Sequence, residues 1–279
     1  MSYKTIVCYT DSLEAVEEVV TVSCMLAEQY DAHLTGLYVT PPPPIYATAE
    51  IATPAMLVNY HDQYHHELSD KIEEVFIALT ESRGGTAEWR RVDAVSSVSA
   101  TVAELGHTAD LVVVSGALTD STNGFADDRL SRIISASRRP TMVIPTDVVI
   151  DAIGKHIMVG WDGSDESTRA VFDALPLLKT AGRVDLLRIN PAGSERHHTF
   201  GTQSELVNTL ARHGVKANLS FSACAVGEVA SELLRTAFEQ GADLLVTGAY
   251  GHSRMHDLLM GSVTRKILAD AKLPVLMAH

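Results

Sequence analysis

Short aliphatic segments alternate with longer amphipathic segments along the chain, and this alternation predicts strands separated by helices. In the second half it predicts strands near residues 155–161, 183–189, 216–222, 243–247 and 273–278, with helices near 166–181, 201–213, 227–240 and 262–271. In the first half it predicts strands near residues 3–9, 33–39, 86–92, 110–115 and 140–144, and a long helix over 55–82. Most strands lack a clean apolar–polar alternation, which fits burial on both faces. The expected fold class is therefore α/β, with parallel strands and helices on both faces of the sheet.

The two halves are rough copies of each other. Lys4–Ser12 parallels Lys155–Ser164, and Ala109–Val114 parallels Ala242–Thr247. Self-similarity over this length indicates duplicated domains. Two tandem doubly wound domains, joined by a short linker and packed together, are expected over residues 1–146 and 153–279.

A glycine-rich segment lies between the predicted fourth strand and the last helix of the second half. It reads G-x2-G-x9-G-S, with Gly248, Gly251, Gly261 and Ser262 at the defined positions. Glycine lets a backbone approach a ligand closely, and a helix start offers unpaired N–H groups and partial positive charge. This spacing between a strand and a helix therefore predicts a phosphate site. The alternative, that the glycines only end a strand and start a helix, stays open.

The net charge of −13 is concentrated in the first half. Residues 1–146 hold 20 acidic and 9 basic side chains, against 15 and 13 in residues 147–279. This acidity argues against nucleic acid as the main partner and makes the second half the better place for a polyanion. The apolar stretches are too short to span a membrane and the N-terminus has no cleavable signal pattern, so we expect a cytoplasmic protein. Cys8, Cys24 and Cys224 fit reduced thiols rather than a disulfide framework.

The second half resembles a universal stress protein domain of the nucleotide-binding type. The matching segments are Met158–Ser164, Ala242–Ser253, Leu259–Thr264 and Leu273–Met277. The resemblance is looser over residues 1–146, so the whole chain is similar to a tandem universal stress protein. It implies a five-stranded parallel sheet of order 3-2-1-4-5 in each half. It also implies ATP as the ligand of the second half, with ADP or AMP as alternatives.

By this resemblance the nucleotide contacts the ends of the first, second and fourth strands and the start of the last helix. The residues concerned are Gly160, Trp161, Asp162, Ile189, Gly248, Gly251, His252, Ser253, Gly261, Ser262 and Val263. Asp162 would lie beside the adenosine, Ile189 would meet the adenine through its backbone, and the glycine loop would cradle the phosphates. Mg²⁺ is a candidate companion ion at Asp162. Asp162 has a second interpretation as a helix cap, although Ser164 or Asp165 can cap that helix instead.

The first half departs from this motif. Ser115, Leu118, Asp128 and Arg129 stand where the motif has its three glycines and its serine. Asp127 and Asp128 would place carboxylates beside a phosphate, at roughly 4 kcal/mol of repulsion for each contact at about 4 Å and an effective dielectric of about 20. We therefore expect the first half not to bind ATP through this loop. A packing role and a different ligand both stay open for it.

No catalytic constellation stands out, because the chain lacks a P-loop, a G-x-S-x-G elbow and an H-E-x-x-H helix. We predict a regulatory nucleotide binder rather than an enzyme with fast phosphoryl transfer. A slow ATPase or nucleotide hydrolase is one alternative, and a scaffold that binds a different small ligand in the first half is another. His61 and His65, at i and i+4, are weak metal candidates that would need further ligands, and a solvated helix face is the default interpretation.

The predicted fifth strands, Thr141–Ile144 and Pro274–Ala278, are edge strands in this order. Universal stress proteins, which this chain resembles, commonly pair through this edge. We therefore expect the two halves to pair through it within the chain. Such pairing shields both edges from unwanted association. A homodimer of whole chains stays open, and an adenine nucleotide is the expected small-molecule partner.

Overall fold

The computed structural model describes residues 2–43, 54–84, 86–117, 129–146, 148–192, 200–249 and 262–279. The first half contains β1 (Thr5–Tyr9), α1 (Val16–Tyr30), β2 (His33–Thr40), α2 (Pro54–Glu81), β3 (Ala87–Asp93), α3 (Val98–Gly106), β4 (Leu111–Ser115), α4 (Arg129–Ala136) and β5 (Thr141–Ile144). The second half contains β6 (His156–Gly160), α5 (Asp165–Asp173), α6 (Leu175–Thr180), β7 (Arg183–Pro191), α7 (Phe200–Arg212), β8 (Ala217–Cys224), α8 (Val229–Glu239), β9 (Leu244–Gly248), α9 (Ser262–Asp270) and β10 (Val275–Ala278).

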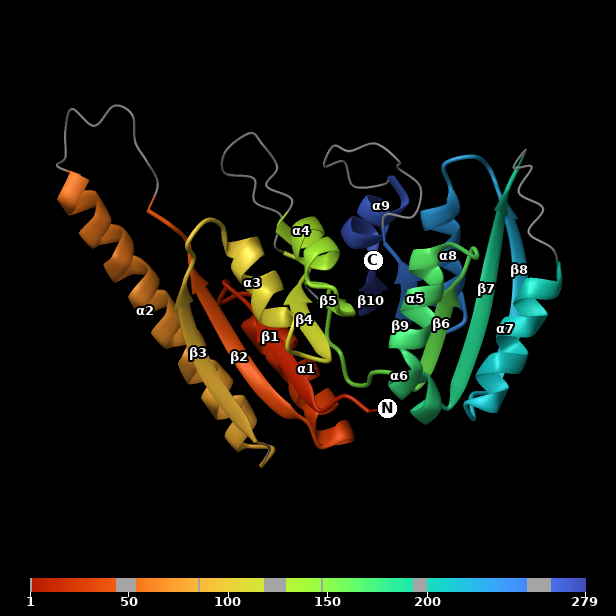
Figure 1. Cartoon of the computed structure of the whole chain (residues 1–279), viewed down its shortest axis with the longest axis horizontal. Helices are drawn as coiled ribbons and strands as arrows, with labels where there is room; N and C mark the ends of the chain where they lie inside the picture. Colours follow the sequence, from red (N-terminus) through yellow and green to blue (C-terminus); the bar gives the residue numbers. More distant parts are fainter. Residues whose placement is uncertain are drawn as a thin grey trace.

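The ten strands of the described chain form one sheet, in the order β3-β2-β1-β4-β5-β10-β9-β6-β7-β8. Figure 1 shows the two halves side by side, with β5 and β10 between them. Neighbouring strands within each half are parallel. The predicted α/β class and the strand order 3-2-1-4-5 in each half are therefore confirmed.

Two apolar cores cover the two faces of the sheet, because successive side chains of a strand point to opposite faces. In β1, Ile6 and Cys8 join the core that contains residues of α1, α2, α5, α6 and α7. Val7 and Tyr9 join the other core, which contains residues of α3, α4, α8 and α9. Each core includes residues of both halves, so the sheet is covered by helices on both faces along its whole width.

One predicted helix is divided in the structure. The sequence predicts a single helix over residues 166–181, but α5 ends at Asp173 and α6 begins at Leu175, with Ala174 as a cap of both. Pro176 explains the break, because it has no backbone N–H to continue a helix but fits the first turn of a new one.

The two halves meet at β5 and β10, which pair antiparallel, with Val143 opposite Val275 and Thr141 opposite Met277. This is the edge at which the sequence predicts pairing. Because the two strands run in opposite directions, the carboxyl end of β5 lies beside the amino end of β10. The last turn of α9, which leads into β10, is thereby brought to the carboxyl-terminal edge of the first half's strands.

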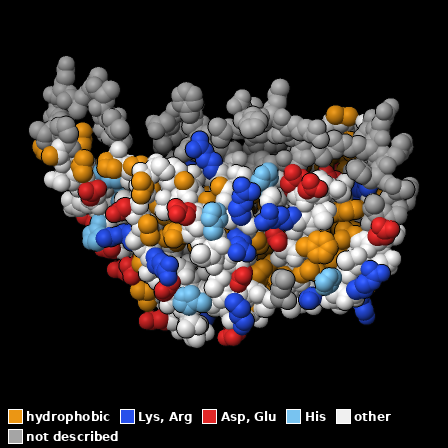
Figure 2. Space-filling view, in the orientation of Figure 1, with side chains coloured by type: hydrophobic (Ala, Val, Ile, Leu, Met, Phe, Trp, Pro, Cys, Tyr) orange, Lys and Arg blue, Asp and Glu red, His pale blue; other side chains and the backbone are white. Residues whose placement is uncertain are grey.

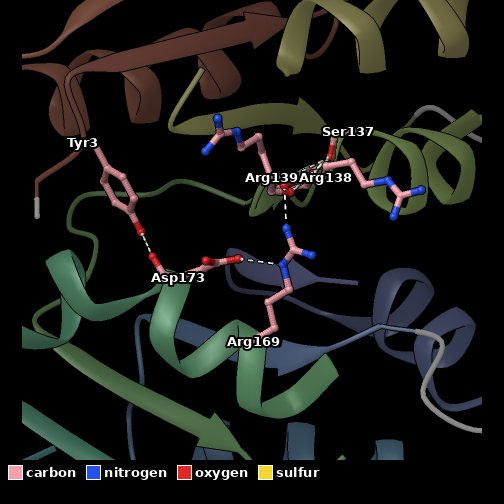
Figure 3. Close-up of polar contacts among 7 residues, drawn as sticks. Tyr3, Ser137, Arg138, Arg139, Arg169 and Asp173 are labelled. Carbon is pink, nitrogen blue, oxygen red and sulfur yellow. Dashed lines mark hydrogen bonds and ion pairs between the residues drawn. The ribbon is translucent and has the colours of Figure 1, made fainter. Parts of the chain in front are cut away.

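Side chains also connect the halves along one face of this junction (Figure 3). The Tyr3 hydroxyl donates to the backbone carbonyl of Asp173 at 2.7 Å, and the Arg169 guanidinium donates to the carbonyl of Arg138 at 2.7 Å. Figure 2 shows lysine and arginine side chains gathered toward the middle of this face, where Figure 1 places the junction. Basic side chains therefore gather near the middle of this face (Figure 2), although the chain carries a net charge of −13.

Candidate functional site

The crevice of the second half lies where the strand order switches direction. β6 pairs with β7 on one side and with β9 on the other, so Gly160 lies opposite both Leu187 and Thr247. In open parallel sheets, ligands bind beyond the carboxyl ends of the two strands at such a switch point. Asp162 follows β6 and Gly248 ends β9, so the structure brings these two predicted site residues to the same edge of the sheet.

Asp162 is held in place by a tight turn. Its Oδ1 accepts hydrogen bonds from the backbone N–H of Ser164 at 3.0 Å and from the Ser164 hydroxyl at 2.6 Å. Gly163, between them, has a φ of 82°, a left-handed conformation that glycine adopts without strain. The Ser164 hydroxyl oxygen in turn accepts from the N–H of Ser167 and caps α5. The interpretation of Ser164 as the cap is confirmed, and the Asp162 carboxylate is positioned by its turn instead.

Two of the predicted site glycines have a packing role. A Cβ atom on Gly248 would lie 2.5 Å from the backbone nitrogen of Ser167, and one on Gly160 would lie 2.9 Å from the side chain of Leu233. Only glycine at position 248 lets the end of β9 pass this close to the first turn of α5. Gly248 is therefore required by the architecture of the crevice, whatever the ligand.

Trp161 and Ile189 belong partly to the cores. Trp161 is buried, its backbone N–H donates to the Leu187 carbonyl at 3.1 Å, and its indole N–H donates to the Thr168 hydroxyl at 3.3 Å. Ile189 is half-buried near the end of β7 and packs against the core that contains α8. These contacts hold Trp161 and Ile189 in place at the carboxyl ends of β6 and β7, next to the Asp162 turn.

The far side of the crevice is the start of α9. Ser262 and Val263 are its first residues, and both are exposed. The N–H groups of a first helical turn have no partner within the helix, so they can donate to an anion. Gly251, His252, Ser253 and Gly261 lie outside the described residues.

The equivalent place in the first half is bridged by an ion pair. α4 begins at Arg129 where α9 begins at Ser262, and the Arg129 guanidinium lies 2.7 Å from Asp11, which follows β1. Both side chains are at least three-quarters buried, and the Tyr9 hydroxyl also donates to Asp11 at 3.2 Å. Burial raises the pKa of Tyr9, which keeps that hydroxyl protonated. Leu118, Asp127 and Asp128 lie outside the described residues.

The two metal candidates face the sheet rather than the solvent. His65 Nδ1 lies 2.6 Å from the Tyr38 hydroxyl, and the side chain of His61 is only 11% exposed. Burial raises the pKa of Tyr38 and lowers that of His65, so the tyrosine donates and a neutral imidazole accepts. The default interpretation of a solvated helix face is wrong, because the register of α2 turns this pair toward β2. No cluster of three or more potential metal ligands occurs within the described ranges.

Comparison with known proteins assigns a family to this arrangement. Residues 154–279 match the universal stress protein family. A universal stress protein of Mycobacterium tuberculosis is 31% identical over 145 residues, which cover 45% of this chain and 96% of the relative. One of Synechocystis is 26% identical over 162 residues, which cover 55% of this chain and 51% of the relative.

A solved structure extends the likeness to the whole chain. The crystal structure of a universal stress protein from Archaeoglobus fulgidus superposes with a TM-score of 0.73 at 13% identity, covering 98% of this chain and 95% of the other. The chain belongs to the universal stress protein family. In the part of the chain that is described, no helix has both the length and the apolar character needed to cross a bilayer.

Proposed function

We propose that the second half binds ATP in the crevice between β6 and β9 and acts as a regulatory nucleotide binder. The adenosine would lie beside the Asp162 turn, and the phosphates would lie against the start of α9. Three features support the proposal: the switch-point position, the exposed amides and hydroxyl at Ser262, and the fixed Asp162 carboxylate. Asp162 is also the residue that would hold a Mg²⁺ ion between the protein and the phosphates.

The observation that carries the proposal is the contrast between Ser262 and Arg129. These residues occupy the first position of equivalent helices. In the first half the Arg129 guanidinium lies 2.7 Å from Asp11, so an ion pair connects the helix start with the residue that follows β1. In the second half the same position has a short hydroxyl side chain, which suits a phosphate oxygen as a hydrogen-bond partner. ATP binding is therefore expected in the second half alone.

The proposal does not include fast hydrolysis. The described crevice contains a carboxylate and helix-start amides, whereas phosphoryl transfer also needs a cationic clamp and a positioned base. Bound ATP would instead change the contacts of α9, whose Ile267 belongs to the core that contains residues of both halves. Pairing of β5 with β10 would keep the two halves together in solution, so that this change reaches both of them.

Placing the arginine of position 129 at the equivalent position 262 tests whether the second half binds ATP. Ser262→Arg should form an ion pair with Asp162, as Arg129 does with Asp11, and should close the crevice to the phosphates. We expect calorimetry to show ATP affinity reduced by at least about a hundredfold, the loss of roughly two charge-assisted hydrogen bonds. Ser262→Ala, which removes only one neutral hydrogen bond, should weaken ATP binding by less than about tenfold.

Asp270→Asn is the matched control. It raises the net charge by the same single unit as Ser262→Arg but lies at the other end of α9. Its ATP affinity should stay close to that of the wild type. The proposal fails if Ser262→Arg binds ATP as tightly as Asp270→Asn while both remain folded.

A further inference from the structure

A cavity of about 380 Å³ lies between the two halves, away from the nucleotide crevice. The first half contributes Gly116 after β4, Leu130 on α4 and Pro145 after β5. The second half contributes Arg265, Leu268 and Lys272, on α9 and just beyond it. None of the described residues assigned to the nucleotide lines this cavity, so it is a separate feature of the molecule.

The position of the cavity is one that ligand sites favour. It lies beyond the carboxyl ends of β4 and β5, the edge at which sheets of this type bind ligands. It also lies at a junction of two packed units, and its volume falls within the roughly 300–1,000 Å³ that is usual for small-molecule sites. The antiparallel pairing of β5 with β10 brings α9 of the second half against this edge.

The lining has two chemical characters. Leu130, Pro145 and Leu268 supply apolar surface, which gains free energy by covering a hydrocarbon group. Arg265 on α9 and Lys272 just beyond its end both line the cavity, and they contribute a guanidinium and an ammonium group. Both groups bind carboxylates, sulfonates and phosphates through charge-assisted hydrogen bonds.

We propose that this cavity between the halves binds a small amphipathic anion. Its acidic group would lie between Arg265 and Lys272, and its hydrocarbon body would pack against Leu130, Pro145 and Leu268. Binding would contact both halves at once and would therefore stabilise their present arrangement. The proposal stands on the cavity and its lining alone and does not require that the second half binds ATP.

Anilinonaphthalene sulfonate, a fluorescent amphipathic anion, is a direct probe for the full-length protein. We expect saturable enhancement of its fluorescence from a single class of sites, without added nucleotide. Octanoate should displace the probe, whereas octanol at the same concentration should not, because only octanoate offers an anionic group. The double variant Arg265→Gln with Lys272→Gln should bind the probe at least roughly tenfold more weakly, which corresponds to the loss of at least one charge-assisted hydrogen bond.

Lys266→Gln is the matched control, because it removes a positive charge from the same helix at a position that does not line the cavity. It should bind the probe as the wild type does. The proposal is overturned if no saturable binding occurs, or if octanol displaces the probe as well as octanoate does. It is also overturned if the double variant binds as tightly as Lys266→Gln while circular dichroism shows that both are folded.

Discussion

At the residue scale, Arg129 and Ser262 distinguish two equivalent crevices. Arg129 forms an ion pair with Asp11 in the first half, whereas Ser262 has only a short hydroxyl side chain in the second half. The sequence alone shows that Arg129 replaces the serine of the motif, and it predicts from this that the first half does not bind ATP through the loop. The partner of Arg129 could not be predicted, because Asp11 lies 118 residues away and no spacing rule connects them. The burial of His61 and His65 could not be predicted from the sequence either, because it depends on which face of α2 packs against β2.

Asp185 carries a prediction about acid stability. It is 5% exposed and accepts from His156 at 2.6 Å and Asn218 at 3.0 Å, and Arg183 lies 2.7 Å away. Burial raises the pKa of Asp185, but the hydrogen bonds from Asn218 and His156 and the charge of Arg183 outweigh it and lower the pKa below its ordinary value. The stabilisation is therefore present above the unfolded-state pKa of about 3.9 and is lost as the pH falls through the folded-state pKa.

Replacing this carboxylate tests the assignment. Asp185→Asn should lower the free energy of unfolding by roughly 2–3 kcal/mol at neutral pH, measured by urea denaturation. The difference from the wild type should shrink as the pH is lowered below about 4. Asp31→Asn, which removes an exposed ion pair with Lys4, should change stability by less than about 1 kcal/mol. A penalty for Asp185→Asn that is independent of pH would contradict this account.

At the scale of elements, the aliphatic runs predict the strands to within two or three residues, because most strands inside the sheet are buried on both faces and contain few polar positions. β4, for example, is buried at every residue from Leu111 to Ser115. The break between α5 and α6 is less visible, because Pro176 is compatible with both a helix end and a helix start. The close approach of β9 to α5 could not be predicted, because the glycine motif does not show which element Gly248 packs against.

Gly248→Ala separates packing from ligand binding. The added Cβ would meet the backbone of Ser167, which cannot move without shifting α5, so we expect a loss of roughly 1–3 kcal/mol in the free energy of unfolding without nucleotide. Gly182→Ala is the control, because its nearest neighbour would be the Lys155 carbonyl at 3.3 Å. If Gly248→Ala is no less stable than Gly182→Ala, the packing role assigned to this glycine is wrong.

At the scale of the whole molecule, one sheet carries two crevices of the same design but different chemistry. The first half holds most of the net negative charge and bridges its crevice with the Asp11–Arg129 ion pair. The second half is nearly neutral and presents Ser262 at the corresponding helix start. The duplicated fold therefore has two switch points, and we propose that only the one in the second half binds a nucleotide.

Native mass spectrometry of the full-length chain with ATP and Mg²⁺ measures this asymmetry most directly. The account predicts a mass increase of one nucleotide for each chain at saturation, and no increase for Ser262→Arg. Two nucleotides for each wild-type chain, or none, would contradict it.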